Sequence, residues 1–148
     1  MIVTNSVQDD SSWHVEHTTE ANARPQTIWT LFRDVAGWKL WNPGVANSQL
    51  DGPFAIGTWF TMTPTGGEPL RSQLLDVREN ECFVDETRVG ELVVTVQHRL
   101  TALSNGRTRI SYALSAEGPG ATEIGPLVAA DFPDVLASLR ARVSEARP

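Results

Sequence analysis

Six consecutive segments between residues 45 and 117 have strand-like composition, and turn residues separate each segment from the next. The predicted strands are Val45–Leu50, Gly57–Thr63, Leu70–Arg78, Cys82–Arg88, Glu91–Leu103 and Arg107–Glu117. The connections are short, and the Asn105-Gly106 pair before the last strand is a strong hairpin signal. Strands joined in this way pair with their sequence neighbours, so the pattern predicts an antiparallel meander.

One strand and two short helices are predicted before the meander. Trp13–Thr19 alternates and is rich in residues that favour strands. Asn22–Pro25 has the composition of a helix start, with Pro25 near the first helical position. Gly37 separates this first helix from a second helical turn at Trp38–Trp41.

The C-terminal segment returns to helical spacing. Steps of three and four residues place one apolar stripe along it, made of Ile124, Val128, Phe132, Val135, Leu139 and Val143. Pro133 interrupts the stripe, which predicts either a kink or two abutting helices with Pro133 starting the second.

This long helix is the one element large enough to cover a face of the sheet. The element order therefore predicts an α+β helix-grip fold, a curved antiparallel sheet wrapped around the C-terminal helix, with a space between them. We expect residues 12–147 to form a single ligand-binding domain and residues 1–11, which are polar and without periodicity, to be a disordered lead.

Composition limits the partners. The chain has 148 residues and a formal net charge of −6, which argues against nucleic acid or an anionic membrane surface as the main partner. The N-terminus has neither the basic nor the apolar region of a signal peptide, so we expect a cytoplasmic protein without membrane insertion. Cys82 is the single cysteine, and we expect it to be a small core or edge residue rather than a reactive thiol.

The element order and several motifs resemble the START-related, birch-pollen-allergen-like (SRPBCC) superfamily. The motifs are Ala23–Trp29, Asp34–Pro43, Gly57–Phe60, His98–Leu100, Gly106–Ile110 and Leu136–Arg140. Within the superfamily the chain is most similar to the polyketide cyclase/dehydrase and lipid-transport group, over about residues 12–147. The resemblance implies a hydrophobic cavity but no particular reaction, because the superfamily includes carriers, cyclases, receptors and co-chaperones.

Alternation predicts which side chains face that cavity. One face of the fifth meander strand carries Leu92, Val94, Val96, His98 and Leu100, and the matching set across the hairpin is Thr108, Ile110, Tyr112 and Leu114. His98 and Tyr112 are therefore expected to come close together. They are the candidates for ligand contact or proton transfer, and the alternative is a pair of hydrogen-bonded core residues.

The two preceding strands offer further polar candidates. Arg71 and Gln73 share a face with Val77, so Arg71 is placed either at the cavity mouth, where it would meet a carboxylate, or at an exposed sheet end. Asp85 or Glu86 faces inward on the next strand, and alternation does not decide which. A buried carboxylate would have a raised pKa and act as a general acid or base, whereas a solvated one would not.

The remaining expected lining residues are mostly apolar. Trp38 and Trp41 border the cavity entrance by resemblance, although plain packing suits them equally. Phe60 and Met62 share a face of the sheet interior. Val128, Asp131 and Phe132 come from the C-terminal segment, where Asp131 either meets the ligand or caps the segment after it.

Three functions fit these expectations. The first is binding of a small hydrophobic molecule such as a lipid, an isoprenoid or an aromatic polyketide-like compound. The second is a polyketide cyclase or dehydratase, and the third is a co-chaperone-like interaction module. The sequence has no metal-ligand, phosphate-loop or dinucleotide motif, so we expect neither metal nor cofactor, and both monomer and homodimer remain open.

The cavity lining distinguishes the three. A cavity lined by apolar groups alone favours carriage. A cavity in which His98 and Tyr112 converge with Arg71 or an acid favours catalysis, and the lack of any cavity favours an interaction module.

Overall fold

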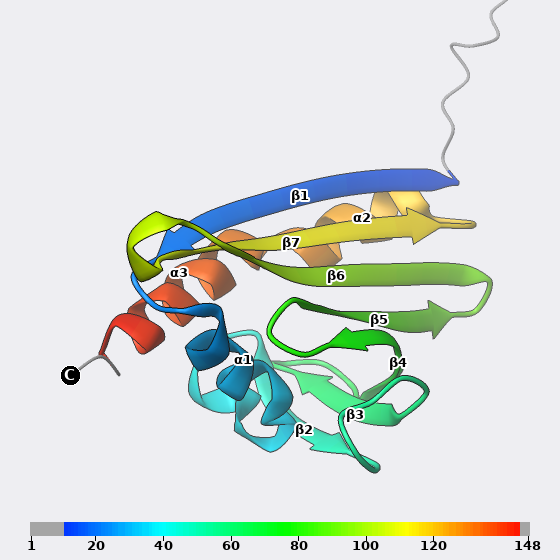
Figure 1. Cartoon of the computed structure of the whole chain (residues 1–148). Helices are drawn as coiled ribbons and strands as arrows, with labels where there is room; N and C mark the ends of the chain where they lie inside the picture. The colour runs from blue at the N-terminus through cyan, green and yellow to red at the C-terminus, as the bar shows by residue number, and fades with distance from the viewer. Residues whose placement is uncertain (1–10, 146–148) are drawn as a thin grey trace, which may run out of the picture.

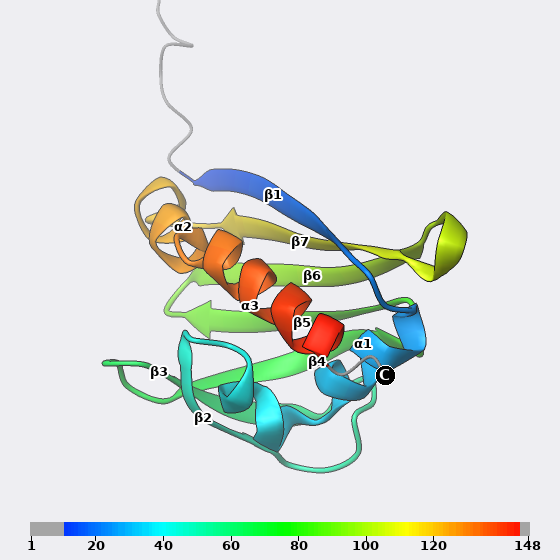
Figure 2. The same ribbon diagram turned by 90° about the vertical axis from the view of Figure 1, so that its left-hand side faces the viewer.

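Seven antiparallel strands form one curved sheet, and the two C-terminal helices lie across its concave face (Figure 1, Figure 2). This computed structural model describes residues 11–145, so the predicted disordered lead lies outside the described residues apart from Ser11. The elements are β1 (Ser12–Ala21), α1 (Pro25–Arg33), the 3₁₀ helix η2 (Val35–Leu40), β2 (Val45–Leu50), β3 (Trp59–Pro64), β4 (Leu70–Arg78), β5 (Cys82–Val89), β6 (Leu92–Ala102), the 3₁₀ turn η3 (Ser104–Gly106), β7 (Thr108–Glu117), α2 (Ala121–Ala129) and α3 (Phe132–Glu145). The predicted helix-grip fold is confirmed.

The strand order across the sheet is β1-β7-β6-β5-β4-β3-β2. β2 to β7 therefore form the predicted meander, and β1 adds to its far edge beside β7. The meander boundaries differ from the sequence expectation by at most two residues. At β3 the difference has a physical cause, because Gly57 has a φ of +94° and belongs to the preceding turn rather than to the strand.

The apolar stripe of the C-terminal segment is divided between two helices, as one of the two predicted alternatives required. α2 ends at Ala129, α3 begins at Phe132, and Pro133 is the second residue of α3, where its missing N–H costs no helical hydrogen bond. The inward face of α3 is fully or nearly fully buried at Phe132, Val135, Leu136, Leu139 and Val143. At α2, the ring of Trp13 from β1 packs directly on Gly125, which leaves no room for a side chain there.

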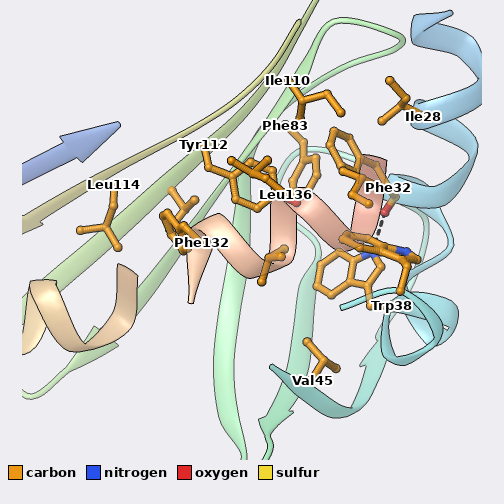
Figure 3. Close-up of a cluster of buried hydrophobic side chains, with 14 of the residues drawn as sticks. Ile28, Phe32, Trp38, Val45, Phe83, Ile110, Tyr112, Leu114, Phe132 and Leu136 are labelled. Carbon is orange, nitrogen blue, oxygen red and sulfur yellow. Dashed lines mark hydrogen bonds between the residues drawn. The ribbon is translucent and has the colours of Figure 1, made fainter. Parts of the chain in front are cut away.

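Three buried hydrogen bonds from side chains to backbone carbonyls hold the short helices in place, two of them from strands and one between the helices themselves. Thr108 Oγ1 on β7 donates to the Ala23 carbonyl before α1 at 2.7 Å. Ser48 Oγ on β2 donates to the Val35 carbonyl at 2.6 Å, and Trp38 Nε1 donates to the Phe32 carbonyl at 2.9 Å, as Figure 3 shows. The Phe32 carbonyl is in the last turn of α1, where carbonyls lack partners within the helix, whereas Ala23 precedes α1 and Val35 is the first residue of η2.

Two further expectations concern membrane insertion and the single cysteine. Within residues 11–145 no helix combines the length and the apolar composition needed to cross a membrane. Cys82 is 2% exposed, and burial raises the pKa of its thiol. The side chain therefore packs as a small core residue, as expected.

Leu139 is fully buried on α3. Its replacement tests how α3 packs on the sheet. We expect Leu139→Ala to lower the free energy of unfolding by about 2–5 kcal/mol, because it removes apolar contacts and leaves a cavity. Arg140→Ala, at the exposed neighbouring position, should change it by less than about 0.5 kcal/mol. Urea denaturation of the three proteins measures the difference, and equal midpoints would contradict this packing.

Candidate functional site

A cavity of about 350 Å³ lies between the concave face of the sheet and the α2–α3 segment. Its size falls in the range of small-molecule sites. Most of its wall is apolar, made by Trp38, Val45, Phe60, Met62, Pro64, Leu70, Val89, Val94, Val96, Ile124, Leu127, Val128, Phe132 and Val135. Its polar members are Asn42, Ser72, Asp85, Thr87, His98, Tyr112 and Asp131.

His98 lies at the centre of the polar members, held between two aromatic rings. Its imidazole stacks on Phe83 of β5 at 3.9 Å between ring centroids, and the edge-to-face contact with Tyr112 of β7 is at 4.6 Å. Nδ1–H donates to the Phe83 carbonyl at 3.2 Å, which leaves Nε2 as the nitrogen without a proton in the neutral ring. Burial lowers the pKa of His98 to about 3, although the Phe83 hydrogen bond acts in the opposite direction. The ring is therefore neutral at physiological pH.

Asp85 is the inward carboxylate of β5. It shares a face with Phe83, whereas Glu86 lies on the outer face and pairs with Arg88 at 3.0 Å. Asp85 Oδ2 is 3.8 Å from His98 Nε2, within ion-pair distance but too far for a hydrogen bond. Burial raises the pKa of Asp85 to about 7. Burial disfavours the charged form of both groups, so the pair is neutral below about pH 7, and above it Asp85 ionises beside a neutral imidazole.

Tyr112 is affected by two carboxylates, Asp85 on the sheet and Asp131 on the helical side of the cavity. Tyr112 is only 4% exposed. Its hydroxyl makes no hydrogen bond among the described residues. Burial raises the pKa of Tyr112, and the negative charges of Asp85 and Asp131 raise it further. Asp131 lies at the junction of α2 and α3 with its carboxylate against Gly44, and burial is the main cause of its raised pKa. Both carboxylates are thus close enough to Tyr112 to act on its hydroxyl.

The structure brings together most of the residues that the sequence analysis selected. Besides His98 and Tyr112, the cavity is lined by Trp38, Phe60, Met62, Val128, Asp131 and Phe132. Trp41 is buried but does not line the cavity; its ring packs behind the wall, 6.3 Å from Phe32. Its indole N–H has no partner within the described part of the chain.

Of the two placements open for Arg71 the structure has the exposed one, and the expectation that Arg71 and Gln73 contact a ligand in the cavity is wrong. Arg71 pairs with Asp51 on the outer surface, and Gln73 donates to the Gly57 carbonyl. The cause is a β-bulge in β4, where the register against β5 shifts between Leu74 and Asp76. The extra residue reverses the alternation, so Val77 faces inward while Arg71 and Gln73 face outward. Ser72 is the inward residue that sequence reasoning missed.

The cavity opens to solvent at one end, where several of its lining residues are exposed. Leu127 of α2 is 70% exposed, Val89 at the end of β5 is 52% exposed, and Leu70 and Val128 are also exposed. These side chains come from opposite sides of the opening, so they form an apolar mouth. Val89 is the last residue of β5, and Leu127 and Val128 belong to the last turn of α2. Figure 1 shows the β5–β6 turn and α2 toward the same end of the sheet.

Comparison with known proteins adds a family and a set of similar folds. A family model described as polyketide cyclase / dehydrase and lipid transport matches residues 12–144. No curated protein matches the chain by sequence. Among solved structures, a di-domain ARO/CYC protein, StfQ from the steffimycin biosynthetic pathway, has a TM-score of 0.77 at 15% identity, over 96% of this chain and 54% of that one.

Two further structures match over nearly their whole length. A norcoclaurine synthase point mutant from Thalictrum flavum, in complex with a transition-state analogue, has a TM-score of 0.74 at 14% identity, over 93% of this chain and 97% of that one. A START superfamily protein from Mycobacterium smegmatis has a TM-score of 0.71 at 18% identity, over 90% of this chain and 99% of that one. At these identities the likeness is one of fold.

The raised pKa of Asp85 predicts a pH-dependent stability. The folded state holds the Asp85 proton up to about pH 7, whereas the unfolded chain releases it near the ordinary pKa of 3.8. The stabilisation is therefore complete below about pH 4 and is lost as the pH rises through about 7. Asp85→Asn removes this loss, so the variant should gain stability over the wild type across that window, reaching on the order of 3–4 kcal/mol at pH 8.

Urea denaturation of wild type and variant at several pH values measures this difference. Glu86→Gln, on the outer face of the same strand, is the matched control and should show no such trend. A difference between Asp85→Asn and wild type that stays constant from pH 4 to pH 8 would contradict the burial of a protonated Asp85.

Proposed function

The chain belongs to the polyketide cyclase/dehydrase and lipid transport family, and from this membership and the cavity we propose that it binds a small, largely apolar molecule between the sheet and α2–α3. The ligand enters through the mouth at Leu70, Val89 and Leu127. Its polar group faces Asp85, His98 and Tyr112.

The observation that carries this proposal is the division of the cavity wall. Apolar side chains from five strands and both C-terminal helices surround most of the space, and Asp85, His98 and Tyr112 meet at one region of it. An apolar wall supplies affinity by removing hydrocarbon from water. A few buried polar groups fix orientation, because leaving them without partners is costly.

A second candidate function is favoured by one specific observation, the convergence of an acid with His98 and Tyr112. Asp85, with its pKa near 7, holds or releases a proton at neutral pH, as a general acid–base catalyst requires. His98 is the weaker base, because its pKa is about 3. We therefore assign the proton transfer to Asp85 rather than to His98, and a positioning role to the imidazole.

In a cyclase or dehydratase, Asp85 would transfer the proton and Tyr112 would stabilise the enolate. Ionised Asp85 takes a proton from a carbon next to a substrate carbonyl, and the electron pair of the C–H bond moves to form an enolate. The Tyr112 hydroxyl donates a hydrogen bond to the enolate oxygen. The enolate carbon attacks a second carbonyl of the same chain, and the new alkoxide takes the proton back from Asp85.

Filling the cavity tests the binding function. Val96 lines the cavity on β6, and Val96→Trp adds a large ring to that space. We expect this variant to lose at least about 90% of the binding of aminoanthracene, an uncharged fluorescent probe, in a titration of probe fluorescence. Val93→Trp places the same ring on the outer face of β6 and should bind the probe as the wild type does.

Native mass spectrometry of the purified wild type, followed by extraction, identifies any molecule that accompanies the protein. If both tryptophan variants bind the probe like the wild type, the cavity is not the binding site. If the wild type itself fails to bind it and carries no small molecule, the proposed function is wrong.

The enzymatic candidate has a test of its own. Beta-tetralone is an apolar ketone with exchangeable protons next to its carbonyl, and nuclear magnetic resonance in deuterated water follows their replacement. We expect the wild type to accelerate the exchange and Asp85→Asn to reduce that acceleration at least about 100-fold. Glu86→Gln should retain it, and the rate should rise with pH through about 7. Bound tetralone without acceleration would leave carriage as the function and exclude this catalytic role.

A further inference from the structure

The charged groups of the cavity are all acidic. Asp85 and Asp131 line it, and among the described lining residues none is a lysine or an arginine. The ion pairs of residues 11–145 give Asp131 no cationic partner, and the nearest basic group to Asp85 is the neutral imidazole of His98. One buried carboxyl, Asp85, and one partly buried carboxyl, Asp131, thus line one space without a counter-charge, and an unpaired carboxylate is costly to the extent that it is buried.

A second observation points to a missing ligand group at the same place. Tyr112 is 96% buried, lines the cavity, and its hydroxyl has no hydrogen-bond partner in the described structure. The buried atoms without a partner in residues 11–145 do not include this oxygen, so the hydroxyl borders the cavity space, where a bound group can reach it. A donor bound between the acids would satisfy it, because the tyrosine oxygen accepts a hydrogen bond.

From the acidic lining, the unpartnered Tyr112 hydroxyl and the apolar walls, we propose that the ligand is an apolar molecule carrying a basic amine, bound as an ammonium ion beside Asp85, Tyr112 and Asp131. This inference rests on the proposed binding function and names the chemical class of its ligand. The ammonium donates to the carboxylates and to Tyr112, and the hydrocarbon body fills the apolar part of the cavity.

The surrounding rings fit the same ligand. The aromatic side chains of Tyr112, Phe132 and Trp38 line the cavity, and their faces attract a desolvated cation. A carboxylate or phosphate group in this position would face two acids and no cation. The cavity therefore discriminates against fatty-acid and phospholipid headgroups, and the net charge of −6 acts in the same direction at longer range.

The cation also couples binding to pH. The titratable groups nearest Asp85 are His98 from β6 and Tyr112 from β7, and Asp131 lines the same cavity from the helical side and acts on Tyr112. His98 and Tyr112 stay neutral near pH 7, so Asp85, with its pKa of about 7, is the group that changes charge on the sheet side. Ammonium binding favours ionised Asp85, so affinity for the amine rises from about pH 6 to about pH 8.

Three probes of nearly equal shape test the inference: naphthylethylamine, naphthylethanol and naphthylacetate, which are cationic, neutral and anionic. Isothermal calorimetry with the full chain at pH 7.5 measures each affinity. We expect the amine to bind about tenfold more tightly than the alcohol, and the carboxylate to bind most weakly. Asp85→Asn and Asp131→Asn should each reduce the preference for the amine over the alcohol, and Glu86→Gln should leave it unchanged.

The outcomes separate this inference from the function on which it rests. The amine assignment is wrong if the alcohol or the carboxylate binds as tightly as the amine, or if the preference survives both aspartate variants. In either case the proposed binding function stands. If none of the three probes binds and aminoanthracene also fails, both fail together. Amine affinity that does not change between about pH 6 and about pH 8 would also overturn the role of Asp85.

Discussion

The apolar stripe of α3 must leave water, and the concave face of the sheet is the surface that accepts it. Leu136, Leu139 and Val143 pack closely against the strands, so the C-terminal half of α3 fixes the distance between the two layers. β1 to β7 belong to one continuous hydrogen-bonded sheet, so the same sheet also forms the wall at the other end. There the helical segment breaks between α2 and α3, the side chains no longer fill the gap, and the cavity remains.

The break between α2 and α3 also explains the apolar mouth of the cavity and the inward position of Asp131. Helix α2 is held against β1 by the Trp13 ring on Gly125, and it leaves Leu127 and Val128 exposed at the mouth. Asp131 lies in the short connection, where a polar side chain reaches the interior without interrupting a packed helix face. Apolar exposure of this kind is costly in an isolated domain, and a ligand that covers it would recover part of that free energy.

Burial acts in opposite directions on the two central ionisable groups. It raises the pKa of Asp85 and lowers that of His98, so the carboxyl keeps its proton to higher pH and the imidazole stays neutral. The stacking of His98 on Phe83 and its hydrogen bond to the same residue hold the ring in one orientation. Carriage and catalysis use this arrangement differently: a carrier needs the polar groups to orient its ligand, whereas an enzyme needs Asp85 to exchange a proton near neutral pH.

The sequence alone determined the order of elements, the meander, the break near Pro133 and the facing of His98 and Tyr112. These follow from local periodicity, and on β6 and β7 apolar neighbours mark the inner face without ambiguity. On β5 the run Asp85-Glu86-Thr87-Arg88 is polar throughout, so only its pairing with β6 decided that Asp85 faces inward. On β4 the adjacent Leu74 and Leu75 leave two opposite alternations open, and only the tertiary structure revealed the bulge that turns Arg71 and Gln73 outward. The acidic, cation-free lining was likewise decided by the tertiary fold, since it depends on which face of several distant strands meets one cavity.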